Sequence, residues 1–289
     1  MKTQRKIAKL ISPTPVSDGA GVKLNRLIAT PTLDYLDPFL LLDHFGSDNK
    51  DDYIAGFPEH PHRGIETVTY MLKGKVTHRD TMGNEGTISA GDIQWMTAGG
   101  GLMHEEMPVA EAEGLSGFQL WVNLPKELKM SKPRYQEVKA DKIPVYEKDG
   151  AKVKVIAGEV GDIKGAVSEI YAEPNYLDVT LEANAEWTHP IALGHNAFAY
   201  IFSGSADFDE SGSFVANPKL VILTDGDFVK IKAGETGARF LLVSGKPLNE
   251  PVARYGPFVM NTRAELYQAI EDLQNGTFVW TEEKEVVTI

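Results

Sequence analysis

The sequence predicts an all-β protein of two similar halves followed by one short helix. Short apolar runs rich in β-branched and aromatic residues are separated by Gly, Pro and Asn turns, which is typical of strands. A weak copy of the first half returns later in the chain, and helical spacing is clear only beyond Val252. Strands at short, regular spacing favour a sandwich or barrel. With 289 residues, the chain is long enough for two domains, each with its own core.

Strand signals are strongest in the first half. β-branched and aromatic residues alternate with turn residues, and these patterns predict strands over residues 23–28, 39–45, 66–72, 76–80, 87–88, 93–97 and 115–124. Beyond them the composition becomes rich in charge, which is typical of a connector between domains. We therefore expect an N-terminal domain over 1–130, a linker over 131–150 and a C-terminal domain over 151–289.

The chain ends in a predicted helix over about 262–275. Thr262 followed three residues later by Glu265 forms a capping-box pattern. Gly276 can end the helix in the left-handed conformation. Apolar residues keep helical spacing at Leu266, Ala269, Ile270 and Leu273.

Composition excludes several classes of function. Hydrophobic content is 42% and charged content 24%, and no apolar run approaches the roughly 20 residues that span a bilayer. The apolar stretch over 7–13 is too short for a signal peptide, so we expect a cytoplasmic protein. The formal charge of −12 repels a phosphate backbone, which argues against direct nucleic-acid binding. The absence of cysteine excludes disulfides and thiolate metal ligands.

Two short runs carry the chemistry. His60 and His62 are two residues apart, as are His104 and Glu106, so in an extended chain each pair shares one face. Brought face to face, the pairs offer three imidazoles and one carboxylate, a set that suits a divalent transition metal better than calcium or magnesium. An extended chain would aim Glu66 in the same direction, so Glu66 is an alternative source of the carboxylate ligand. Glu105 should point away into solvent.

These runs resemble the metal-binding motifs of the cupins. His60, His62 and Glu66 match the first motif, and the second appears as residues 91–98 followed by His104. Some features depart from the general pattern, among them Thr97 in place of a proline and a carboxylate two residues after the last histidine. Those departures resemble one subfamily, the pirins, and the likeness continues through residues 42–45, 56–58, 94–99, 120–125 and 255–262.

The resemblance implies two tandem cupin jelly-roll barrels, the first of which binds metal. In pirins the carboxylate comes from the position of Glu106, which implies the ligands His60, His62, His104 and Glu106. Glu66 would then lie behind the ligands or pair with Arg63. Fe(II) is the implied metal, and nickel, cobalt, copper, manganese and zinc also accept this ligand set.

The resemblance also implies an activity. Several pirins are described as flavonol (quercetin) 2,3-dioxygenases, which open a hydroxylated ring system with O2. Here Glu106 would be the catalytic base that takes the proton of the substrate's 3-hydroxyl. Alternatively, as in other pirins, the metal would tune a surface that binds a protein partner. A zinc ion in a closed shell of the same four ligands would make the site structural.

Within the second half, the first-half pattern returns without its ligands. Residues 199–204 match residues 69–74 at an offset of 130, and residues 225–230 match residues 90–95 at an offset of 135. At these offsets the counterparts of the four ligands are Pro190, Ala192, Arg239 and Leu241. We therefore expect a degenerate second cupin.

The remaining candidates have plainer explanations. Four histidines lack a ligand-spaced partner, and a hydrogen-bonded structural role is expected for His44, His78, His189 and His195. Resemblance places His44 near the mouth of the pocket. Aromatic and Met residues in strands are mostly core, so only Phe57, beside the histidine pair, is expected to line a pocket. The run over residues 99–101 should let the backbone pass close to the metal.

Overall fold

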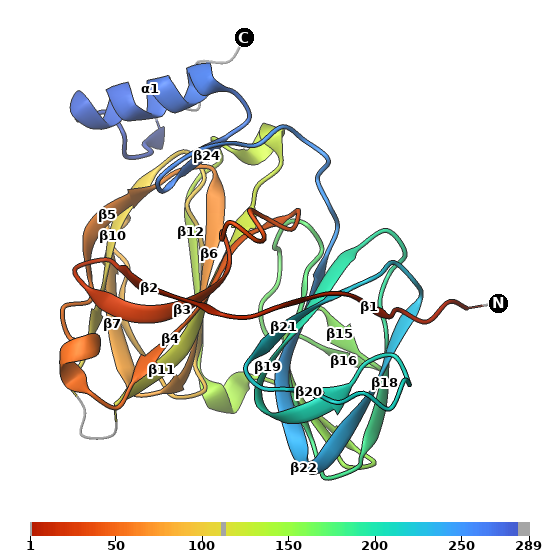
Figure 1. Cartoon of the computed structure of the whole chain (residues 1–289). Helices are drawn as coiled ribbons and strands as arrows, with labels where there is room; N and C mark the ends of the chain where they lie inside the picture. Colours follow the sequence, from red (N-terminus) through yellow and green to blue (C-terminus); the bar gives the residue numbers. More distant parts are fainter. Residues whose placement is uncertain (1, 111–113, 283–289) are drawn as a thin grey trace. The chain divides into compact units, whose positions relative to one another are not determined.

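The computed structural model describes residues 2–110 and 114–282 and confirms an all-β chain with a C-terminal helix (Figure 1). The described residues form two compact units, each assembled from segments that are discontinuous in sequence. We call them the histidine unit and the second unit. The histidine unit contains the described parts of Pro15–Ala29, Phe39–Ala140 and Leu248–Ile289. The second unit contains the described parts of Met1–Thr14, Thr30–Pro38 and Asp141–Pro247.

This division differs from the expected contiguous domains 1–130 and 151–289, whose outermost residues, 1 and 283–289, lie outside the described residues. The expected linker over 131–150 contributes a strand to each unit. Its strand β12 (Arg134–Val138) pairs with β9 (Ile93–Thr97), and β13 (Val145–Lys148) pairs with β14 (Ala151–Ala157). Composition indicated a connector because these strands are polar on their exposed faces, but their backbones are paired.

Two antiparallel sheets form the histidine unit. The larger runs β12, β9 (Ile93–Thr97), β6 (Ile65–Lys73), β11 (Leu115–Asn123), β4 (Phe39–Ser47), β3 (Val22–Ile28) and β2 (Thr14–Asp18). The smaller runs β5 (Phe57–His62), β10 (Leu102–Pro108), β7 (Lys75–Asp80) and β8 (Glu85–Ser89). The predicted strands are therefore present, and β5 and β10 carry the two ligand runs side by side (Figure 1).

Both faces of the larger sheet are buried at its interior strand β6. On β6, Val68 and Tyr70 on one face and Thr67 and Thr69 on the other are at most 3% exposed. Side chains three residues apart on a strand point to opposite faces. Thr69 lines the cavity described below, so its face of β6 is the face toward that cavity. Glu66, three residues earlier, therefore lies on the other face.

The second unit has one nine-stranded sheet and a small hairpin. The main path is β1 (Ile7–Ile11), β21 (Lys219–Leu223), β19 (Asn196–Asp207), β22 (Phe228–Gly245), β17 (Asn175–Leu181), β14 (Ala151–Ala157) and β13. The additional strands are β18 (Glu186–Pro190), β20 (Val215–Ala216) and the hairpin β15 (Glu159–Val160) and β16 (Ile163–Lys164). Its core comprises 23 buried apolar side chains, which supports an independent hydrophobic centre.

Strand pairing shows that the 135-residue offset is wrong. β19 pairs with β21 and with the end of β22, as β6 pairs with β9 and β11. The start of β22 pairs with β18, as β10 pairs with β5. The residues of β18 that face the core are Trp187 and His189, opposite Ile231 and Val229, and the described residues of this unit form no group of three candidate metal ligands. Repeated Gly-Asp turns produced the false match.

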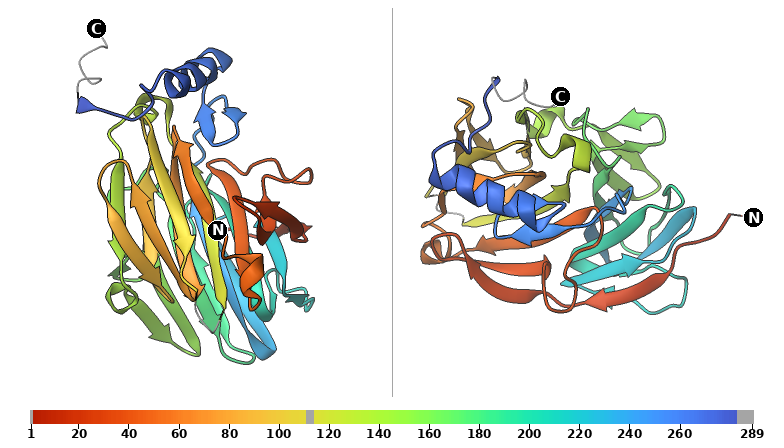
Figure 2. Two further views of the ribbon diagram at one scale, coloured as in Figure 1. Left: turned by 90° about the vertical axis from the view of Figure 1, so that its left-hand side faces the viewer. Right: turned by 90° about the horizontal axis from the view of Figure 1, so that it is seen from above.

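The C-terminal segment returns to the histidine unit. It forms the hairpin β23 (Ala253–Tyr255) and β24 (Phe258–Met260) and then the helix α1 (Arg263–Gln274), which lie together at one end of that unit's strands (Figure 2). Both hydrogen bonds of the predicted capping box between Thr262 and Glu265 are present. With 12 residues and many charges, α1 does not qualify as a membrane span, and the described chain has no longer helix. Short 3-10 turns occur at Lys50–Asp52, Lys126–Leu128 and Ala140–Lys142.

Candidate metal centre

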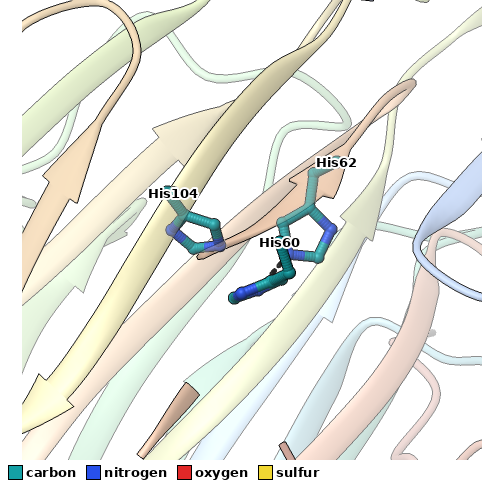
Figure 3. A group of neighbouring side chains, drawn as sticks. All are labelled: His60, His62 and His104. Carbon is teal, nitrogen blue, oxygen red and sulfur yellow. Dashed lines mark hydrogen bonds between the residues drawn. The ribbon is translucent and has the colours of Figure 1, made fainter. Parts of the chain in front are cut away.

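Strands β5 and β10 bring three histidines together. Their register places His60 directly opposite His104, and His62 opposite Leu102. The three imidazoles point toward one another, two from β5 and one from β10 (Figure 3). One ring nitrogen from each lies within 4.8 Å of the others, and this is the sole group of three or more candidate ligands within the described residues. Sequence spacing thus identified the histidine cluster.

A cavity of about 540 Å³ opens beside this cluster within the histidine unit. Side chains from both sheets line it, and most of the wall is apolar. Its volume lies within the range of roughly 300 to 1,000 Å³ that is usual for small-molecule pockets. Polar groups on its wall include His60, His62, Glu106, Asp43, Arg26 and Arg254.

Burial keeps two of the imidazoles neutral. His62 and His104 are each 1% exposed. Loss of solvation holds the pKa of both well below the usual value of 6.5, and neighbouring histidines lower it further. A neutral imidazole retains a nitrogen lone pair, which is the form that binds a metal.

The donor atoms fit a divalent transition metal. Nε2 of His60 and Nε2 of His62 are 3.1 Å apart, and Nδ1 of His60 lies 2.9 Å from the Pro58 carbonyl oxygen. A proton on that Nδ1 leaves the Nε2 lone pair free. Nε2 of His104 is buried and has no hydrogen-bond partner among the residues that the structure describes. A metal ion would satisfy these nitrogens, which otherwise face one another.

Glu106 lines the same cavity but lies outside the 4.8 Å group. Its Oε1 accepts a hydrogen bond from the Thr69 hydroxyl at 2.8 Å, and its Oε2 accepts one from Nε2 of Gln119 at 3.1 Å. The carboxylate is only 6% exposed. Hydrogen bonds from the facing sheet therefore fix its position on the cavity wall.

Glu66 is placed on the other side of β6. It is fully buried, and its Oε1 accepts a hydrogen bond from the Thr97 hydroxyl at 2.7 Å. Arg63, the partner considered for Glu66, instead forms an ion pair of 2.7 Å with Asp272 and donates to the Phe278 carbonyl. Glu66 is thus separated from the histidines by the sheet itself.

Of three further residues with a predicted place, two lie where they were expected and one does not. Glu105 points outward and lies 3.6 Å from Arg79, as expected. Phe57 lines the cavity, also as expected. His44 does not, because Asp43 beside it faces the cavity and the His44 ring packs against Phe118 at 4.7 Å.

Sequence reasoning missed two residues on the cavity wall. Trp121, expected in the core, lines the cavity and meets the His62 ring edge-on at 5.0 Å. The guanidinium of Arg254 lies over the Trp121 ring at 5.0 Å and donates to the Leu40 carbonyl. Arg254 comes from the C-terminal segment, and no spacing or periodicity connects it with the distant histidine runs.

Family models agree with both halves of the chain. The pirin model matches residues 21–122, and the model of the pirin C-terminal cupin domain matches residues 176–279. Together these matches cover more than half of the chain. The two units are therefore a tandem pair of cupin domains, as the first half of the sequence suggested.

Similar proteins and solved structures agree with the family models. A pirin-like protein of Caulobacter vibrioides is 46% identical over 277 residues, which is 95% of this chain and 99% of that protein. A crystal structure of quercetin 2,3-dioxygenase from Acinetobacter baumannii is 36% identical, with a TM-score of 0.86 over 96% of this chain and 99% of that one. A bacterial pirin from Escherichia coli in complex with nickel(II) shares the fold at 21% identity, with a TM-score of 0.67 over 83% of this chain and 99% of that one. This chain belongs to the pirin family.

Proposed function

We propose that this protein is a metal-dependent dioxygenase that opens flavonol-like substrates with O2. The observation that carries the proposal is a cluster of three histidines, two of which line a cavity of about 540 Å³ together with a fixed carboxylate. Similarity to the Acinetobacter baumannii quercetin 2,3-dioxygenase supports the choice of substrate class.

His60, His62 and His104 would hold the metal, with Glu106 as the fourth ligand. Fe(II) is the metal that we propose, and nickel, cobalt, copper, manganese and zinc are the alternatives to be tested. When bound, the metal would supply Lewis acidity toward the substrate hydroxyl and redox chemistry toward O2. Imidazole and carboxylate ligands suit any of these ions, so only measurement identifies the metal.

Glu106 would also accept the proton of the substrate hydroxyl. Thr69 and Gln119 hold its carboxylate by hydrogen bonds of 2.8 and 3.1 Å, so the acceptor is oriented before substrate arrives. A positioned base of this kind contributes roughly 100-fold to 10,000-fold to a rate. Phe57 and Trp121 supply flat apolar wall for a ring system, and the mostly apolar lining limits water near the reacting carbon atoms.

The test begins with protein purified without added metal or chelator. Bound metals are counted by mass spectrometry, the protein is reloaded anaerobically with Fe(II), and O2 uptake with quercetin is recorded. Glu106→Gln should reduce kcat at least about 100-fold. Glu105→Gln is the matched control, because that carboxylate sits on the same strand but points toward Arg79.

Each outcome is decisive. Uptake that depends on quercetin and falls in Glu106→Gln but not in Glu105→Gln supports the dioxygenase. The reloading is repeated with nickel, cobalt, copper, manganese and zinc. One metal per chain without uptake for any of the six metals rejects the enzyme and favours the alternative, a redox-sensing protein that acts on a protein partner. Absence of bound metal after reloading rejects the metal centre itself.

A further inference from the structure

His78 lies directly behind the metal-facing histidine of β10. It sits on β7, where its Cα is opposite Glu106, and its side chain is fully buried. Nδ1 of His78 is 3.4 Å from Nδ1 of His104. On the far side, Nε2 of His78 is 3.2 Å from Oδ2 of Asp80. Three side chains thus form a line from a carboxylate to a candidate ligand.

Hydrogen-bond donors around His78 determine where its proton lies. The Asp80 carboxylate can only accept, so Nε2 of His78 carries a proton. Nε2 of Gln94 donates to Nδ1 of His78 at 2.8 Å, so that Nδ1 carries a lone pair. That lone pair also faces Nδ1 of His104.

The arrangement favours one tautomer of His104. The single lone pair of His78 Nδ1 faces both Nε2 of Gln94 at 2.8 Å and Nδ1 of His104 at 3.4 Å. A proton on Nδ1 of His104 avoids two lone pairs that face each other, so this tautomer of His104 is favoured. The remaining nitrogen, Nε2, then has a free lone pair and no hydrogen-bond partner within the described residues. Neutral histidine in water prefers the opposite tautomer, with the proton on Nε2, which cannot bind a metal through that atom.

We propose that His78 is a positioning residue that holds His104 in the tautomer whose Nε2 binds the metal. The inference rests on the metal-binding part of the proposed function and does not require the dioxygenase reaction. Its role is the one that a carboxylate or carbonyl usually performs behind a metal-bound histidine, where removal of the contact costs roughly 10-fold to 100-fold in metal affinity.

Neighbouring groups hold the side chains of Asp80 and His78 in this arrangement. Oδ1 of Asp80 accepts hydrogen bonds from the backbone nitrogens of Met82 at 2.9 Å and Asn84 at 3.0 Å, so Oδ2 stays directed at His78. The Tyr135 ring stacks on the His78 ring, with centroids 4.9 Å apart and planes inclined by 24°. Rotation of His78 is therefore restricted from both sides.

Two substitutions of His78 separate the loss of its hydrogen-bond acceptor from the loss of its ring. His78→Phe removes the acceptor and keeps a planar ring. His78→Gln removes the ring and keeps an amide oxygen that can accept from Nδ1 of His104. His189→Phe is the matched control, because His189 is also buried, at 2% exposure, and belongs to the second unit.

Metal affinity is measured by competition with a chelator, using Zn(II) as the probe ion, and circular dichroism verifies folding. We expect affinity to fall 10-fold to 100-fold in His78→Phe and to stay within about 3-fold of the original in His78→Gln and His189→Phe. An unchanged affinity in His78→Phe would overturn the proposal.

Nitrogen-15 NMR of the metal-free protein tests the tautomer without any metal. The original protein should show His104 protonated at Nδ1, and His78→Phe should shift it toward protonation at Nε2. Asp80→Asn is a second variant in case His78→Phe does not fold, and it should shift the tautomer in the same direction. If His104 is protonated at Nε2 in the original protein, the proposal is wrong even if metal binds. If metal does not bind but the tautomer is as expected, only the proposed function fails.

Discussion

Thr69 donates a hydrogen bond to Glu106 across the histidine unit, with 2.8 Å between the hydroxyl and carboxylate oxygens. The bond connects β6 of the larger sheet with β10 of the smaller one. It also distinguishes the two carboxylates that the sequence offered as a ligand. Glu106 lines the cavity together with His60 and His62. Glu66, three residues before Thr69, instead accepts a hydrogen bond from Thr97 on the opposite face of β6.

Replacement of Glu66 should therefore leave the metal in place. We expect Glu66→Gln to bind the same number of metal ions per chain as the original protein, since an amide can still accept from the Thr97 hydroxyl. Glu106→Gln should bind metal more weakly. Metal content of both variants, measured by mass spectrometry after dialysis, checks the expectation, and loss of metal from Glu66→Gln alone would reverse the assignment.

Removal of one imidazole should abolish useful metal affinity. His62→Ala deletes one of three converging nitrogens, and we expect a loss of at least about 100-fold, because contacts merely behind a ligand already cost 10-fold to 100-fold. Chelator competition measures the loss. His195→Ala in the second unit is the control, and a parallel loss there would show that the effect is not specific to the cluster.

The ion pair between Arg63 and Asp272 should contribute to stability well beyond a surface pair. Arg63 directly follows the histidine pair, its side chain is 2% exposed, and it also donates to the Phe278 carbonyl. Asp272→Asn leaves a buried guanidinium without its carboxylate, which costs about 3 kcal/mol of unfolding free energy. Urea titration measures the difference. Glu85→Gln removes an exposed partner of Arg79 and should lower the unfolding free energy far less, because solvent screens that pair.

Acid should destabilise the second unit through His189. Burial lowers the pKa of His189 to about 4 in the folded chain, whereas an unfolded histidine titrates near 6.5. Between these pH values the unfolded chain binds a proton that the folded chain does not, so the unfolding free energy falls as pH drops from about 6.5 toward 4. The loss attributable to His189 is at most about 3 kcal/mol.

His189→Phe removes this contribution, and its stability should decline less steeply over the same range. Urea titrations at several pH values, followed by tryptophan fluorescence, make the comparison, because Trp187 stacks on His189 at 5.1 Å. Identical slopes for the two proteins would contradict the expectation.

Features that depend on residues close together in the sequence could be predicted from the sequence. The capping box at Thr262 and the facing histidine runs were readable because each depends on spacing within a few residues. The orientation of Glu66 could not be predicted, since β6 is buried on both faces and burial therefore does not indicate which face carries the carboxylate. Arg254 was missed because its place in the cavity depends on contacts between segments far apart in sequence.

The unit boundaries were missed for a related reason. β1 pairs with β21, and residues 248–282 return to the histidine unit, so chain order does not follow unit order. Composition shows how polar a segment is, but it does not show which segment far away in the sequence pairs with it. The false offset of 135 residues arose in the same way, from turn residues that recur in any antiparallel sheet.

The return of the C-terminal segment also sets an order of events during protein synthesis. The Trp280 backbone nitrogen donates to the Gly101 carbonyl at 2.8 Å, and Lys129 bridges the carbonyls of Gly64 and Val259. Translation must continue from Glu106 to Trp280, which takes roughly 10 to 35 s at 5 to 20 residues per second. During that interval the nascent chain carries all three histidines without the contacts that complete their unit. We therefore expect stable metal loading to follow translation of this segment.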